Sequence, residues 1–204
     1  LSFSVSNPVV TVMAASTSKP YGANDPALTY TYLPSNTPVY FSGSLEREAG
    51  ETTGEYAINQ GTLTADGVSL RFIPGTFTIE KTSAVIQVAD YSDVYDGEAH
   101  GVSGTAVGIN GEDLSSLLTY SSTYTDVPGG KTTWFFKGNE NYLPATGEAL
   151  VTILPREIVV SANALSKYYG NPDPYFSYKI TNGSLLKGDG LTGKITRDSG
   201  ETVG

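Results

Sequence analysis

The sequence predicts an all-β protein made of small β-sandwich modules in tandem, and three observations support this. The 204 residues include 23 Gly, 11 Pro and 14 Tyr but only one Met, a composition typical of strands and turns. Short apolar–polar alternations recur between clusters of turn residues. The third observation is an internal repeat, which favours several similar modules over one large domain.

The repeat covers most of the C-terminal quarter of the chain. Residues 18–26 read Ser-Lys-Pro-Tyr-Gly-Ala-Asn-Asp-Pro, and residues 166–174 read Ser-Lys-Tyr-Tyr-Gly-Asn-Pro-Asp-Pro. The similarity continues in residues 43–54 and 193–204, which share a Gly…Arg-x-x-Gly-Glu-Thr-x-Gly pattern at equal spacing. Two modules of one kind are therefore expected, with a different one between them.

The repeat and the alternating segments predict the module boundaries. We expect 1–7 to be the last strand of a preceding module, 8–81 and 82–154 to be whole modules, and 155–204 to be a second, truncated copy of the first kind. The junctions near 80–82 and 154–156 are short and not rich in Gly or Ser, so the modules should follow each other with little slack.

The expected strands follow in order along the chain. In the first module they lie near 9–15, 28–33, 39–45, 55–60, 68–73 and 76–80, and in the second near 84–89, 100–107, 117–124, 131–137 and 148–153. A short helical turn is expected at 112–117. A real helix there would favour a β-grasp-like module, which is the alternative to the sandwich.

The repeated Tyr-Gly-x-x-Asp-Pro motif is typical of a turn. Its glycine can take a positive φ, its aspartate can form an Asx turn, and its proline fixes φ for the returning chain. A metal site would need more carboxylates at this point, so a structural role is expected. The motif residues are Tyr21, Gly22, Asp25 and Pro26, and in the second copy Tyr169, Gly170, Asp173 and Pro174.

Other aromatic residues are also expected to have structural roles. Gly54 and Tyr56 resemble the entry to a late strand in immunoglobulin-like sandwiches, where the tyrosine hydroxyl bonds an upstream backbone group. The single Trp, Trp134, is expected to anchor the core of the middle module. Most of the other tyrosines fall on expected strands or turns, which favours packing over exposed sugar-stacking surfaces.

The middle module has its own early turn at Tyr95, Asp96 and Gly97. Asp-Gly favours a hairpin when strands flank it. The only histidine, His100, follows closely beside Glu98. A metal needs three or four ligands and acid–base catalysis needs a positioned partner, so we expect no functional role for this histidine.

Charge and composition exclude several classes of function. The 21 acidic residues against 12 Lys and Arg give a net charge of -9, which disfavours nucleic acid. There is no Cys, and no apolar run is long enough for membrane insertion within this fragment. Phosphate loops, nucleophile elbows and His–carboxylate constellations do not occur, so we expect no enzymatic activity, cofactor or metal.

The motifs together resemble a known family. The Tyr-Gly-x-x-Asp-Pro opening, the Arg-x-x-Gly-Glu-Thr-x-Gly-x-Tyr centre and the Pro-Gly-Thr-Phe-Thr-Ile close of residues 74–79 are similar to MBG domains of the YGX type. The middle module resembles the related repeats with a Tyr-Asp-Gly signature and bacterial Ig-like repeats. The resemblance implies arrays in large secreted or cell-surface bacterial proteins, many of them adhesin-like, with no catalytic residues.

We therefore expect a stalk or spacer segment of a large secreted or cell-surface bacterial adhesin, whose partners are the neighbouring modules. Direct binding of a host or environmental glycan or protein is one alternative, and an accessory region of a secreted carbohydrate-active enzyme is another. A further hypothesis is a stabilising Lys–Asn amide bond, because disulfides are missing and Lys19 and Lys167 stand on or near first strands.

Overall fold

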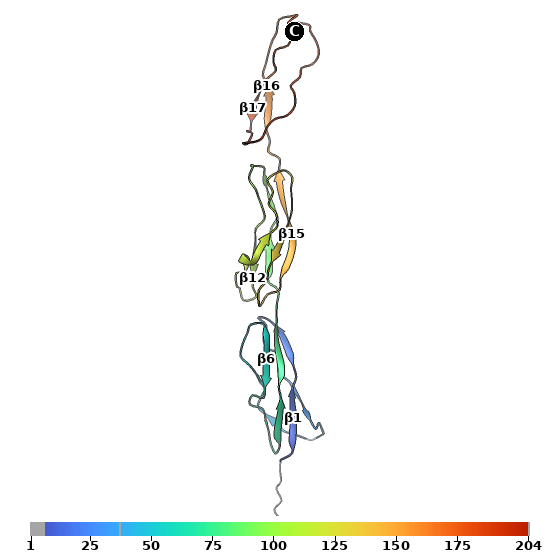
Figure 1. Ribbon diagram of the computed structural model, residues 1–204, viewed down its shortest axis with the longest axis vertical. Coiled ribbons are helices and arrows are strands. Elements are labelled where there is room, and N and C mark those ends of the chain that lie inside the picture. Colours follow the sequence, from blue (N-terminus) through green and yellow to red (C-terminus); the bar gives the residue numbers. More distant parts are fainter. Residues whose placement is uncertain (1–6, 37, 204) are drawn as a thin grey trace, which may run out of the picture. The chain divides into compact units, whose positions relative to one another are not determined.

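The computed structural model describes residues 7–36 and 38–203, which form β-strands joined by turns (Figure 1). In these ranges the one helical element is η1 (Ser115–Leu117), a three-residue 3-10 turn. The all-β expectation is confirmed, and the β-grasp alternative is wrong because the segment 112–117 holds no α-helix. The predicted strand over 1–7 lies, apart from Asn7, outside the described residues.

The described chain forms two compact units, and their limits differ from the predicted module boundaries. A dense set of internal contacts joins the first module to part of the middle one, and another joins the rest of the middle module to the C-terminal segment. The first unit runs to Gln87 and includes Gly104–Thr119 and Phe135–Gly147, and the second comprises Val88–Ser103, Tyr120–Trp134 and the chain from Glu148 on.

The first module is a sandwich of two main sheets. One sheet has the strand order β3 (Tyr30–Leu33), β1 (Val9–Ala14), β8 (Ser69–Ile73). The other has the order β2 (Thr17–Pro20), β9 (Gly75–Glu80), β6 (Gly54–Asn59), β5 (Glu46–Arg47). A small pair, β4 (Phe41–Ser42) with β7 (Thr64–Ala65), completes it.

The first strand of this module divides between the two sheets. β1 pairs antiparallel with β3 and parallel with β8, and after Ala15 and Ser16 the chain continues as β2, which pairs parallel with β9. The Ser16 hydroxyl accepts a hydrogen bond from the Thr76 N–H at 3.0 Å. The alternating pattern predicted a single strand over 9–15 and missed β2.

Alternating side chains of both sheets fill the core between them. Val10 and Val12 come from β1, Ile58 from β6, and Phe77 and Ile79 from β9, and all five are almost fully buried. The two sheets are held by this cluster, since apolar burial is the main favourable term in folding.

The middle module repeats this plan. β10 (Val85–Val88) pairs with β12 (Gly104–Val107), and the larger sheet has the order β11 (Tyr91–Val94), β15 (Ala145–Leu154), β14 (Gly129–Phe136), β13 (Leu118–Tyr120). Its first strand also divides, because β11 follows β10 and pairs parallel with β15. The Asp90 carboxylate accepts a hydrogen bond from the Leu150 N–H at 2.7 Å. Asp90 thus corresponds to Ser16 of the first module, whose hydroxyl also accepts from a backbone N–H of the last strand.

The sheets of the middle module bear on one of its predicted turns. The Asp96-Gly97 hairpin is wrong, because β11 before it and β12 after it belong to different sheets. Trp134 on β14 is half-buried and packs against the core cluster of Val102, Ala149, Val151 and Ile153. In the C-terminal segment, β16 (Val159–Ala162) pairs antiparallel with β17 (Tyr178–Asn182).

Candidate functional site

Four charged side chains meet behind the Tyr-Gly turn of the first module. Lys19 lies at the end of β2, Asp25 in the following turn, Arg47 on β5 and Glu51 just before β6. The Lys19 ammonium lies 2.6 Å from a carboxylate oxygen of Asp25 and 2.6 Å from one of Glu51. The Arg47 guanidinium donates to the other oxygen of Asp25 at 2.6 Å and also to Glu51.

The two cations of this cluster are sheltered and its carboxylates face outward. The Lys19 side chain is only 4% exposed and that of Arg47 is also well buried, whereas Asp25 and Glu51 remain exposed. The Arg47 guanidinium lies 4.8 Å from the centre of the Phe77 ring, a cation–π distance. The cluster therefore covers the end of the apolar core with paired charges instead of leaving it open.

The shifted pKa values follow from this pairing. Hydrogen bonds from Arg47, and then from Lys19, lower the pKa of Asp25 from 3.8 to about 2. The bonds from Lys19 and Arg47 lower the pKa of Glu51 as well. Burial opposes the charge on Lys19, but its bonds to Asp25 and Glu51 outweigh burial and raise its pKa. All four groups stay ionised near neutral pH, which is the state of a structural ion network.

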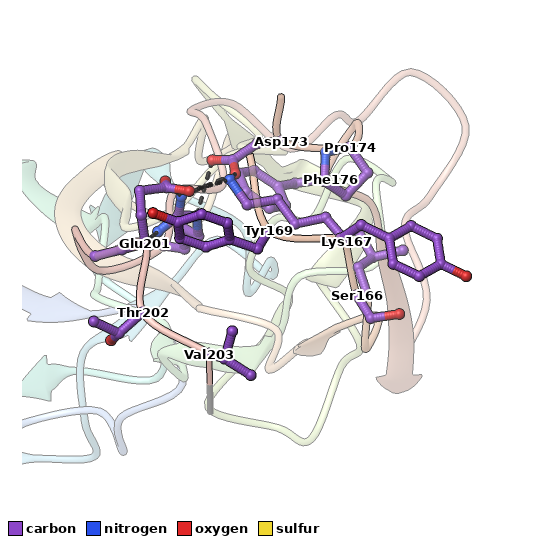
Figure 2. Close-up of a pocket in the computed structure, with 13 residues that line it drawn as sticks. Ser166, Lys167, Tyr169, Asp173, Pro174, Phe176, Glu201, Thr202 and Val203 are labelled. Carbon is purple, nitrogen blue, oxygen red and sulfur yellow. Dashed lines mark hydrogen bonds and ion pairs between the residues drawn. The ribbon is translucent and has the colours of Figure 1, made fainter. Parts of the chain in front are cut away.

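The second copy carries the same cluster with the same connections, as Figure 2 shows. The Lys167 ammonium lies 2.6 Å from Asp173 and 2.7 Å from Glu201. Arg197 donates to both oxygens of Asp173, at 2.8 and 2.9 Å, and these bonds lower the pKa of that carboxyl to about 2. Because four residues far apart in sequence meet identically twice, the network is a property of the repeat.

The second cluster is more open than the first. The Lys167 side chain is 23% exposed, and the cluster borders a pocket of about 500 Å³ (Figure 2). In the first module β9 pairs with β2 and brings Phe77 under the cations, whereas in the described part of the C-terminal segment β16 pairs with β17 alone. Tyr169 at the pocket rim is 77% exposed.

The Tyr-Gly turn forms the tip of the first module and contacts the middle one within the first compact unit. The Tyr21 N–H donates to the carbonyl of Glu80, the last residue of β9, at 2.8 Å. The Tyr21 hydroxyl donates to the Glu112 carboxylate at 3.1 Å, and its ring meets Tyr142 edge-on at 5.5 Å between centroids. Tyr142 is fully buried and donates to the same carboxylate at 2.9 Å.

Glycine is required at this tip for two reasons. Gly22 has a φ of +80°, and a Cβ placed on it would lie 2.5 Å from the Cγ2 of Ile109.

Two further hydrogen bonds reinforce the contact between the first module and the middle one. The Thr53 N–H donates to the Asn141 side-chain carbonyl at 3.1 Å, and the Lys81 ammonium donates to the Asn139 carbonyl at 2.7 Å. The first module is thus joined to this part of the middle one by specific polar and apolar contacts.

The middle module has an equivalent tip, and its contacts lie within the second compact unit. The Tyr95 N–H donates to the carbonyl of Leu154, the last residue of β15, at 2.9 Å. The Tyr95 hydroxyl donates to the Asp189 carboxylate at 3.0 Å. Gly97 has a φ of +83°, and a Cβ there would lie 3.3 Å from the Cδ1 of Leu186.

The remaining residues singled out in the sequence lie on strands and turns. The Tyr56 hydroxyl, two residues beyond Gly54, donates to the Thr52 carbonyl at 2.8 Å, which is the upstream backbone bond expected of it. The Asp96 carboxylate accepts from the Glu98 N–H at 2.9 Å and lies 2.8 Å from Nε2 of His100. Pro26 is exposed and Pro174 is half-buried.

The structure also corrects part of the sequence interpretation. Asp25 and Asp173 were predicted to be Asx-turn residues, but each carboxylate forms ion pairs with an arginine and a lysine. The Lys–Asn amide hypothesis is not favoured, because Lys19 and Lys167 each face two carboxylates. In the described part of the chain no three His, Asp or Glu side chains gather to hold a metal ion, and no helix is long and apolar enough to cross a membrane.

Several of the connecting residues were not found from the sequence. Arg47 and Glu51 had a signal, since both recur in the repeat with Lys19 and Asp25 and carry complementary charges. Glu112, Tyr142 and Asp189 were outside the internal repeat, because they lie in loops of modules that do not align with each other.

Comparison with known proteins agrees with this geometry. The family model described as MBG domain (YGX type) matches residues 10–78 and 158–204, together more than half of the chain, and these segments include both charge clusters and both Tyr-Gly tips. No curated protein matches the chain significantly. The chain therefore belongs to the MBG domain family of the YGX type.

Proposed function

We propose that the chain is a structural repeat segment that acts as a stiff spacer in a large secreted or cell-surface bacterial adhesin. The MBG domain family occurs in large bacterial surface proteins. The observation that carries the proposal is the recurrence of one tip contact: Tyr21 reaches Glu112 in the first unit, and Tyr95 reaches Asp189 in the second. A polypeptide that repeats both its modules and their junctions is suited to spanning distance.

The contacts at the first junction support stiffness in particular. A flexible tether would need no side-chain bonds across it, whereas here Tyr21, Thr53 and Lys81 all bond residues beyond Thr82. Thr82, the first residue of the middle module, is itself held within that module, because its N–H donates to the Asn141 carbonyl at 3.1 Å and its carbonyl accepts from the Leu143 N–H at 2.8 Å.

Rotational diffusion tests the spacer proposal. Nitrogen-15 relaxation of the 204-residue chain is expected to give one common rotational tensor for the amides of β1 to β9 and those of β12 and η1, which lie in the same compact unit, because the junction contacts join them. Separate tensors with independent, faster correlation times would contradict a stiff spacer.

Direct binding of a glycan or protein is the second candidate, and one observation favours it. Tyr168, Tyr169 and Tyr175 of the C-terminal segment are all largely exposed, and aromatic rings can stack on sugars. A glycan array and a panel of host matrix proteins test this alternative, with a Tyr168→Ala/Tyr175→Ala variant as the control. A signal that the variant loses would favour binding over spacing.

A further inference from the structure

The two module tips are received by loops that share a pattern. Tyr21 and Gly22 meet a loop that reads Ile109-Asn110-Gly111-Glu112, and Tyr95 and Gly97 meet a loop that reads Leu186-Lys187-Gly188-Asp189. Each loop consists, in order, of an aliphatic residue, any residue, a glycine and an acidic residue. The two loops come from modules of different kinds, so the shared pattern is not part of the internal repeat.

Each position of the pattern has the same contact in both places. The aliphatic side chain lies over the tip glycine, with Ile109 above Gly22 and Leu186 above Gly97. The loop glycines, Gly111 and Gly188, both have positive φ, which turns the chain back toward the tip. The carboxylate of the final acidic residue then accepts a hydrogen bond from the tip tyrosine hydroxyl, at 3.1 Å for Glu112 and 3.0 Å for Asp189.

We propose that this pairing is the docking rule between consecutive modules, and that the exposed tip formed by Tyr169 and Gly170 is a docking surface for a further module that carries an aliphatic–x–Gly–acid loop. The proposal rests on the spacer function and names the partner surface that such a spacer uses. The tip glycine leaves room for the aliphatic side chain, and the tyrosine hydroxyl donates a hydrogen bond to the acidic side chain. The docking rule therefore requires both steric fit and a charged hydrogen-bond acceptor.

The third tip has the features of the other two without their contacts. Tyr169 follows the repeat register of Tyr21, and Gly170 has a φ of +83° like the other tip glycines. Among the described residues, a Cβ on Gly170 would meet no atom within 4 Å, and Tyr169 is 77% exposed. The occupied tips of the same chain identify the chemistry of the loop that this open tip fits.

Distances between spin labels test the rule in the whole chain, which has no native cysteine to interfere. Glu55→Cys with Thr105→Cys reports on the first junction, and Ser92→Cys with Lys179→Cys reports on the second; all four positions are exposed. The disrupting variant is Tyr21→Phe with Ile109→Asp. Ile109 is 58% exposed, so this change spares the cores. The matched control is Ile109→Leu with Asn110→Lys and Glu112→Asp, which gives the first loop the sequence of the second.

The rule predicts a narrow distance distribution at each junction of the unmodified chain. The disrupting variant should broaden the distribution at the first junction severalfold and leave the second unchanged, and the loop exchange should keep both narrow. Distributions that stay narrow in the disrupting variant would overturn the docking rule and leave the spacer proposal intact. Broad distributions in the unmodified chain would instead overturn the spacer.

The open tip is tested in an extended chain. Gly204 corresponds to Gly54 in the repeat, so residues 55–154 appended after Gly204 supply β6 to β9 and then a second middle module. Labels at Lys179 and at Thr105 of the appended copy should give a narrow distribution that Tyr169→Phe, with Ile109→Asp in the appended copy, broadens. A distribution that is broad in both, with every module folded by circular dichroism and hydrogen exchange, would overturn the assignment of this tip.

Discussion

The ammonium of Lys19 and the carboxylate of Asp25 lie 2.6 Å apart at the end of the first module's core, with the lysine almost wholly removed from solvent. The pair keeps its charges because Arg47 and Glu51 complete a four-member network around it. Its second occurrence, in the C-terminal segment, shows that the family motif encodes an ion network as much as a turn.

The network predicts a loss of stability in acid. The folded-state pKa of Asp25 is about 2, below its ordinary value of 3.8, so the folded state binds this proton less readily than the unfolded chain does. The contribution to the free energy of unfolding is therefore fully present above pH 3.8 and is lost as the pH falls through about 2. Urea unfolding at a series of pH values should show this decline, and Asp25→Asn should flatten it. An undiminished stability down to pH 2 in the unmodified chain would contradict the network.

The intact mass of the protein tests whether Lys19 or Lys167 takes part in a covalent cross-link. The neighbours of Lys19 and Lys167 are ionised carboxylates, and the charge of Arg47 or Arg197 keeps them so. Amide formation requires a neutral amine and a neutral acid, so we expect the full mass of the sequence, with the amines of Lys19 and Lys167 unmodified. A mass lower by one water or one ammonia would show a covalent cross-link instead.

The core of the first module should depend strongly on Phe77. This side chain is fully buried between the sheets and lies beneath both cations of the network. Phe77→Ala is expected to cost about 3–5 kcal/mol. Phe135→Ala is the matched control, because Phe135 is 47% exposed and its loss should cost less than about 1 kcal/mol. Hydrogen exchange of the β6 and β9 amides measures the first effect locally, and equal protection in both variants would be inconsistent with it.

Two glycines in equivalent turns should respond differently to the same substitution. Gly22→Ala and Gly170→Ala both place a side chain at a φ near +80°, which costs about 1 kcal/mol in each. Only Gly22→Ala also forces a methyl group against Ile109, since no atom of residues 7–36 and 38–203 lies within 4 Å of a Cβ placed on Gly170. Amide chemical shifts of 109–112 should therefore change only in Gly22→Ala. Shifts there in Gly170→Ala, or none in Gly22→Ala, would contradict the tip contact.

Local sequence patterns were enough to predict several strands and one side-chain hydrogen bond. Alternating segments located β1, β8 and β9, and the Gly-x-Tyr pattern predicted the backbone bond of the Tyr56 hydroxyl. β2 was missed because Thr17–Pro20 is polar and owes its pairing to β9, a strand far along the chain. Strand pairing of this kind depends on tertiary context more than on intrinsic preference.

The site was less predictable than the fold, because its members lie far apart in sequence. Asp25 was interpreted through its neighbours in the turn, while its partner Arg47 comes from another strand. Glu112 was read as part of a helical turn, and only the fold brings it beneath the Tyr21 hydroxyl. Repetition was the one signal for such residues, and it covers the charge network but not the receiving loops.

The division of the first strand has a mechanical consequence. β2 runs parallel to β9, with Thr17 opposite Phe77 and Pro20 opposite Glu80, so the strands through which the chain enters and leaves the module lie side by side in the same direction. A tensile force on the polypeptide pulls them along their length in opposite senses and loads their hydrogen bonds in shear, all at once. Such bonds must break together and cannot unzip one at a time, so each module resists extension until it yields as a whole.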